Sequence, residues 1–119
     1  MTFQKVADIS IFRLAGDIEL FEGRELRRSL ARLIHTDWPK IILDFDRVEH
    51  VDFKVLVDMV SLVVAAHTLR GQIKLANMSL YHRNILRVSG VEDFFETFDS
   101  LESAIMSFEG GIVSQAGPC

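Results

Sequence analysis

The chain has 119 residues, of which 49% are hydrophobic and 25% charged, a composition typical of one globular domain and not of a disordered chain. Its formal net charge of −4 disfavours nucleic-acid binding, which normally requires an excess of basic residues. The single cysteine, Cys119, excludes a disulfide framework or a cysteine-based zinc site within one chain. We find no signal-peptide pattern and no apolar run that spans a bilayer, so we expect a cytoplasmic protein without direct membrane insertion.

The first half of the chain alternates between strand-like and helix-like segments. Residues 7–15 carry Ile, Phe and Leu on both alternating faces, which predicts a strand covered on both sides. Leucines at helical spacing over residues 22–35 predict an amphipathic helix that ends before Pro39. The continuous apolar run at residues 40–45 predicts a second buried strand.

The same alternation continues in the second half. Residues 55–69 are apolar over most of their length, and a segment this long favours a helix, with Gly71 as its stop signal. A short strand is expected at residues 73–76, a short helix at 79–88 and a last strand at 94–98.

The C-terminal segment begins with a helix-start signal. Asp99 and Glu102 have the spacing of a capping box and predict a helix to about residue 108. Residues 109–119 are rich in glycine and are expected to form a flexible tail. The alternation of strands and helices predicts an α/β fold with a mostly parallel sheet.

Candidate site residues gather at two junctions of the predicted sheet. In open α/β sheets, sites usually lie beyond the carboxyl ends of the strands. Residues 16–19 and 49–54 occupy such positions and bring Asp17, Glu19 and Glu49 to this edge. A pair of these carboxylates would suit acid–base chemistry, although helix capping and solvation are the commoner roles of such side chains.

Motifs for catalysis or cofactor binding are absent from the sequence. The chain has no His-x-x-x-His pair, no Gly-x-x-x-x-Gly-Lys-Ser/Thr phosphate loop and no Gly-x-Gly-x-x-Gly fingerprint. A Gly-x-Ser-x-Gly elbow is also missing. We therefore expect neither an enzyme nor a cofactor or metal site.

The start of the helix at residues 55–69 is the most informative junction. Asp52 stands where a helix N-cap is expected, because a carboxylate there accepts backbone hydrogen bonds and suits the helix dipole. Lys54 opposes that dipole, and Phe53 at a loop–helix junction can remain exposed. Residues that do not favour a helix start, found at such a position, indicate a contact site. The alternative is that Phe53 is buried in the core.

Two charged regions also have alternative interpretations. Arg24, Arg28 and Arg32 repeat every four residues and could meet an acidic partner, but the interleaved Glu22 and Glu25 favour a solvated helix face. From Ser89 onward the chain has no Lys or Arg while acidic residues accumulate. An acidic C-terminal third suits docking to a basic protein surface.

Several segments together resemble the STAS domain, the family of bacterial anti-sigma factor antagonists and sulfate-transporter C-terminal domains. They are residues 14–19 (Leu-Ala-Gly-Asp-Ile-Glu), 41–45 (Ile-Ile-Leu-Asp-Phe), 48–52 (Val-Glu-His-Val-Asp) and 98–105 (Phe-Asp-Ser-Leu-Glu-Ser-Ala-Ile). The resemblance implies a mixed, mostly parallel sheet of about five short strands with about four helices. It places the STAS domain at residues 4–108.

The sequence departs from the family at the start of the long helix. Many members carry Asp-Ser-Ser-Gly or Asp-Ser/Thr-x-Gly there, and a partner kinase phosphorylates the first Ser or Thr. That acceptor position falls on Phe53, which has no hydroxyl, so we expect no phosphorylation at this site. A phosphate adds about 1.5–2 negative charges and can abolish binding, and this switch is missing at its usual position.

The resemblance implies a binding module whose partner is a GHKL-type anti-sigma factor or kinase. Phe53 would be the apolar anchor, and the expected partner-binding residues around it are Asp17, Glu19, Glu49, Asp52, Lys54 and Asp58. The alternative is an accessory subunit of a lipid-transporting ABC system or of a multi-STAS signalling scaffold. Homodimerisation through the apolar helix at residues 55–69 stays open.

Overall fold

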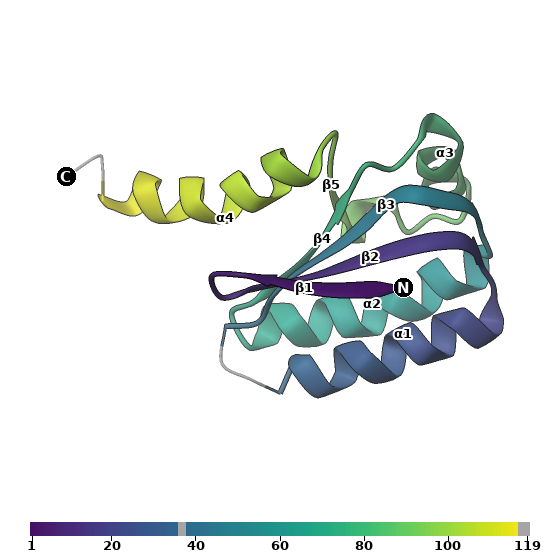
Figure 1. Ribbon diagram of the computed structural model, residues 1–119, viewed down its shortest axis with the longest axis horizontal. Coiled ribbons are helices and arrows are strands. Elements are labelled where there is room, and N and C mark those ends of the chain that lie inside the picture. Colours follow the sequence, from purple (N-terminus) through teal and green to yellow (C-terminus); the bar gives the residue numbers. More distant parts are fainter. Residues whose placement is uncertain (36–37, 117–119) are drawn as a thin grey trace.

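A five-stranded sheet forms the centre of the molecule. The computed structural model describes the backbone of residues 1–35 and 38–116 and, within these ranges, the side chains up to residue 108. The strand order is β1-β2-β3-β4-β5, with β1 antiparallel to β2 and all other neighbours parallel (Figure 1). The strands are β1 (Thr2–Val6), β2 (Ile9–Ile18), β3 (Lys40–Val51), β4 (Gln72–Ala76) and β5 (Glu96–Phe98).

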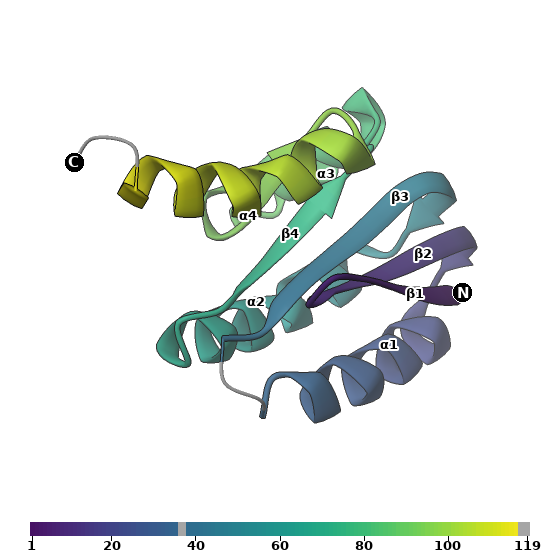
Figure 2. The same ribbon diagram turned by 60° about the vertical axis from the view of Figure 1, so that its left-hand side comes forward.

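Helices cover both faces of this sheet. In both views α1 and α2 lie together against one face, and α4 lies on the opposite side (Figures 1 and 2). The fold is thus the mixed, mostly parallel α/β arrangement that the sequence predicts. The helices are α1 (Leu20–Leu33), α2 (Phe53–Thr68), α3 (Leu80–Val88) and α4 (Leu101–Ala116), with a short 3-10 helix, η1 (Glu92–Phe94), before β5.

The alternation of side chains along β3 creates two cores. Ile41, Leu43 and Phe45 point into the larger core, which α1, α2 and α3 close. Ile42 points into a smaller core on the opposite face, where Ala104 of α4 packs. A strand covered on both sides is what the continuous apolar run at residues 40–45 predicts, because both of its faces lie away from water.

Four strands differ from the sequence prediction. β2 continues to Ile18, past the predicted end at residue 15, and β5 is confined to Glu96–Phe98 because residues 92–94 form a 3-10 helix. The other two are β1 and β3. β1 was missed, because four of its five residues are exposed and its sequence, Thr-Phe-Gln-Lys-Val, has no sustained apolar alternation. β3 continues to Val51, well past the predicted end at residue 45. Residues 46–50 are polar except for the buried Val48. They stay extended because they pair with the second half of β2, across two register shifts in the ladder.

The C-terminal helix also differs from the prediction. α4 continues to Ala116, beyond the expected end near residue 108, although Gly110 and Gly111 lie within it and glycine disfavours a helix. Its start is capped by Ser100 and not by Asp99: the Ser103 amide donates to the Ser100 hydroxyl (3.0 Å). Residues 117–119 lie outside the described chain, and a flexible tail over 109–119 stays a prediction.

A glycine sets the approach of α1 to α2. Gly23 is buried, and a Cβ atom added to it would lie 2.6 Å from the Cγ2 atom of Val55. Valine is branched at Cβ and has one strongly preferred rotamer in a helix, so its methyl group has little freedom to move away. The two helices therefore pack at a distance that only glycine permits at this position.

We predict that the effect of Gly23→Ala on stability changes sign with the residue at position 55. In the wild-type background the added methyl group overpacks the contact and lowers the free energy of unfolding by about 1–3 kcal/mol. In a Val55→Ala background the same change stabilises the protein, because the contact is relieved and alanine favours helix by about 1 kcal/mol over glycine. Urea unfolding of the four variants measures this coupling, and equal effects in both backgrounds would contradict it.

Candidate functional site

The start of α2 is capped locally and is joined to the carboxyl edge of the sheet by a backbone hydrogen bond. The Asp52 carboxylate accepts from the backbone N–H of Lys54 (2.9 Å), which confirms Asp52 as the N-cap. The backbone N–H of Asp52 donates to the carbonyl of Ile18 (2.9 Å), the last residue of β2. Phe53, the first residue of α2, is therefore held next to the paired ends of β2 and β3.

The side chain of Phe53 faces solvent. It is 52% exposed, whereas Val55 and Leu56, two and three residues further along the helix, are buried. The alternative that Phe53 inserts into the core is therefore wrong. Phe53 instead lines an open groove of about 430 Å³ between α2 and α3, which we call the Phe53 groove; its other walls are Tyr81, Asn84, Ile85, Val88 and Ser89.

Large apolar side chains surround the Phe53 groove. Val88 is 85% exposed, and Leu80 and Tyr81 of α3 are exposed as well. Exposed apolar side chains that are contiguous and not scattered mark interaction surfaces, because a partner that covers them removes apolar area from water. Aromatic side chains are the group that most often dominates the energy of such contacts.

The seven candidate residues do not form one cluster. Of these, only Phe53 lines the Phe53 groove. Asp58 lies on the other side of α2, in a groove of about 290 Å³ between α1 and α2, where the Arg27 guanidinium donates to its backbone carbonyl (3.4 Å). Lys54 is exposed in the first turn of α2.

The remaining acidic candidates lie at the same edge of the sheet. Asp17 is paired in register with His50 across β2 and β3. Glu19 precedes α1, and its backbone N–H donates to the carboxylate of Glu22 (3.1 Å). The side chain of Glu49 is exposed on β3. These carboxylates give this edge of the sheet a negative character.

Sequence reasoning missed the contribution of α3 to the groove. Residues 79–88 were predicted as a helix, but Tyr81, Ile85 and Val88 were not identified as site residues. A signal was present, since an amphipathic helix with His82 and Leu86 on its buried face leaves Tyr81 and Val88 on another face. Large apolar residues on that second face indicate a surface with a partner.

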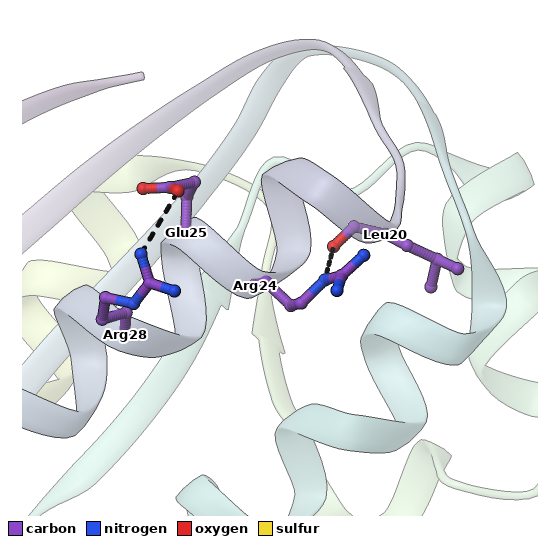
Figure 3. Close-up of polar contacts among 4 residues, drawn as sticks. All are labelled: Leu20, Arg24, Glu25 and Arg28. Atoms are coloured by element: carbon purple, nitrogen blue, oxygen red, sulfur yellow. Dashed lines mark hydrogen bonds and ion pairs between the residues drawn. The ribbon is translucent and has the colours of Figure 1, made fainter.

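The basic face of α1 is engaged in local contacts. The Arg24 Nε donates to the carbonyl of Leu20 (3.4 Å), one turn earlier, and the Arg28 guanidinium lies 3.5 Å from the carboxylate of Glu25 (Figure 3). Both members of the Arg28–Glu25 pair are substantially exposed, so the pair contributes little to stability. This arrangement agrees with the interpretation of a solvated helix face.

A buried histidine holds α3 against β3. His82 is 2% exposed, and its Nε2 lies 3.3 Å from the carbonyl oxygen of Glu49. Because a carbonyl only accepts, the Nε2 carries the proton, and the Nδ1 has no hydrogen-bond partner among the described residues. Next to it the Tyr81 hydroxyl lies 3.0 Å from the Nδ1 of His50.

Burial lowers the pKa of His82 below its ordinary value of 6.5, because the charged imidazolium would lose its hydration. The hydrogen bond to the Glu49 carbonyl opposes this shift, and the nearby His50 adds to it. The unfolded chain therefore binds a proton at a higher pH than the folded chain does. The stability that neutral His82 contributes is complete above about pH 6.5 and is lost as the pH falls toward the lower folded-state pKa.

We predict that acidification destabilises the protein through His82. Between about pH 7.5 and about pH 5.5 the wild type loses free energy of unfolding, because the unfolded state takes up a proton that the folded state resists. In His82→Gln, which keeps an N–H donor for the Glu49 carbonyl, this loss becomes smaller. Urea unfolding at both pH values measures it. The control His35→Gln, at an exposed histidine, keeps the wild-type pH dependence; an unchanged pH dependence in His82→Gln contradicts the assignment.

Comparison with known proteins identifies the family. A family model for the STAS domain matches residues 1–104, and the chain belongs to this family. The anti-sigma factor antagonist SpoIIAA from Bacillus, in its unphosphorylated form, superposes with a TM-score of 0.76 at 19% identity, covering 92% of this chain and 96% of that one. STAS domains are protein-interaction modules.

Other solved structures share the same fold. An anti-sigma factor antagonist from Mycobacterium paratuberculosis gives a TM-score of 0.70 at 14% identity and covers 89% of this chain and 90% of that one. The murine anion transporter Slc26a9 gives a TM-score of 0.71 at 20% identity and covers 90% of this chain but 18% of the transporter. Within the described residues, the helices are too short or too polar to cross a membrane. The fold is thus that of the anti-sigma factor antagonists, and it also occurs within a transporter.

Proposed function

We propose that the protein is a non-catalytic binding module that regulates a signalling partner in the manner of an anti-sigma factor antagonist. The observation that carries the proposal is the exposed Phe53, held at the start of α2 beside an apolar groove. Membership of the STAS family and similarity in fold to two anti-sigma factor antagonists support it. Its expected setting is the bacterial cytoplasm, where such a module acts on transcription by partner switching.

The proposed partner is a GHKL-type anti-sigma factor or kinase. Phe53 contributes apolar contact area at the position where other family members are expected to carry the phosphorylated Ser or Thr. A phosphate at such a contact would add about 1.5–2 negative charges. Phenylalanine has no hydroxyl to phosphorylate, so binding cannot be controlled by a phosphate at this position. Binding is then governed by the affinity and abundance of the partner and not by modification at this position.

The chemistry of the groove supports a binding role. Phe53, Ile85 and Val88 make its lining mainly apolar, and its polar members are the hydroxyls of Tyr81 and Ser89 and the amide of Asn84. An apolar lining with few polar groups suits the burial of a partner's side chain.

The second candidate is an accessory subunit of a lipid-transporting ABC system or of a multi-STAS scaffold. The occurrence of this fold within the murine anion transporter Slc26a9 favours it, because that protein combines the fold with a transport function. Such a subunit would use the same exposed groove for a permanent contact. The identity of the bound protein distinguishes the two candidates.

We predict that Phe53→Asp weakens partner binding by about 30-fold or more, corresponding to about 2 kcal/mol for the loss of an aromatic anchor. The fold stays intact, because the side chain is exposed, and circular dichroism verifies this. Affinity capture of the tagged protein from its native cells, followed by mass spectrometry, identifies the partner. Titration calorimetry with that purified partner then compares the affinities.

Phe21→Asp is the matched control, since Phe21 is 66% exposed in the first turn of α1, outside the Phe53 groove. It should retain the partner. Recovery of a GHKL-type ATPase that Phe53→Asp loses supports the regulatory proposal. Recovery of transporter subunits or other STAS proteins favours the second candidate. Equal partner binding by Phe53→Asp and Phe21→Asp would show that Phe53 does not take part in the contact.

A further inference from the structure

A second groove lies along the C-terminal half of α2, on the side of η1 and β5. It has a volume of about 600 Å³, and we call it the α2–β5 groove. One wall is helical, the other is the segment from η1 into β5, and the start of β4 forms the base. The lining residues are Val63, Val64, His67, Thr68, Gly71, Gln72, Ile73, Asp93, Phe94, Phe95 and Glu96.

Apolar side chains of both walls are exposed in this groove. Val64 of α2 is 49% exposed, and Phe94 of η1, on the opposite wall, is 50% exposed. Phe95 and Ile73 beneath them are buried and close the base. The groove therefore presents apolar surface on both sides, which is the arrangement that receives the apolar face of a helix.

The charge of the α2–β5 groove is acidic. Asp93 and Glu96 line it, and Glu92 lies next to them in η1. Glu96 also contacts the Nζ of Lys74 (3.2 Å). His67 is the one lining residue of basic type among those described, and the chain has no Lys or Arg from Ser89 onward. Carboxylates beside an apolar lining attract cationic groups more strongly than carboxylates in open water do.

We propose that the α2–β5 groove binds a basic amphipathic helix of a partner protein. The apolar face of that helix packs between Val64 and Phe94, and its Lys or Arg side chains meet Asp93 and Glu92. Both the exposed apolar walls and the sign of the charge favour this occupant over an acidic or uncharged one.

This site is separate from the Phe53 groove. Val64 follows Phe53 by eleven residues on the same helix, a separation of about 16 Å along the axis at 1.5 Å per residue. The two grooves have no lining residue in common. Binding at one site can therefore be tested without reference to the other, and the proposal does not depend on the function proposed for Phe53.

A peptide titration followed by NMR tests the proposal on the full ¹⁵N-labelled chain. The probe is a designed helix of roughly 18 residues, long enough to be helical, with leucines on one face and lysines on the other. A Leu/Glu peptide of the same pattern is the charge control. We expect saturable shifts of the backbone amides of Val63, Val64 and Phe94 with the Leu/Lys peptide, and weaker or no binding of the Leu/Glu peptide.

Two charge-reversal variants locate the binding. Asp93→Lys should weaken the Leu/Lys peptide about tenfold or more, whereas Asp58→Lys, which changes the net charge equally but lies on the α1 side of α2, should change its affinity less than about twofold. Val64→Asn removes the apolar wall at an exposed position and should also weaken binding. Spectra of the free variants that match the wild-type pattern verify the fold.

Other outcomes overturn the proposal. Shifts confined to Phe53, Tyr81 and Val88 would assign the peptide to the Phe53 groove. Equal affinity for the two peptides would show that charge does not select the occupant. Equal effects of Asp93→Lys and Asp58→Lys would show that net charge, and not the α2–β5 groove, drives the contact. An absence of saturable shifts would show that the α2–β5 groove does not receive a helix.

Discussion

The parallel pairing of β2 with β3 is the constraint on which the rest of the structure depends. It runs from Ile9 opposite Lys40 to Ile18 opposite Val51, almost the whole length of both strands. Because side chains of β3 alternate between the two cores, loss of this pairing would open both of them. Two register shifts occur in the second half of the β2–β3 ladder, and the strands remain paired beyond them. Both strands therefore end at the same edge of the sheet.

The coincident strand ends determine where the candidate site forms. The hydrogen bond from the Asp52 amide to the Ile18 carbonyl joins the two ends, and α2 begins at the next residue. Phe53 is thus presented from a rigid junction, and the buried His82 fixes α3 as the opposite wall. A surface built on rigid elements loses little conformational freedom when a partner binds, which favours affinity.

The two sides of α2 present different chemistry. Toward α1, the helix meets arginines, and Arg27 is bonded to the backbone of Asp58. Toward α3 and η1, it exposes Phe53 and Val64 beside apolar and acidic neighbours. This division follows from helix geometry, because residues three or four apart share a face while their neighbours point elsewhere. One helix can in this way present two separate contact surfaces along one exposed side.

The sequence by itself determined the features that depend on local chemistry. The period of apolar residues located α1 and α2, the continuous run located the buried half of β3, and the cap at Asp52 followed from its position before the helix. The family resemblance of the ordered segments supplied the strand and helix count. The exposure of Phe53 was only one of two alternatives at that stage. A periodic pattern predicts which face of a helix is buried, but it does not settle the burial of one side chain at the helix start.

Tertiary structure decided what depends on partners distant in the chain. β1 and the polar end of β3 are strands because β2 supplies their hydrogen bonds. The local sequence of these segments does not predict that pairing. The groove exists because α3 packs next to α2, bringing Tyr81 and Val88 beside Phe53 from about 30 residues away. Asp58, in contrast, is close to Phe53 in sequence yet lies in another groove, because five residues along a helix turn a side chain to a different face.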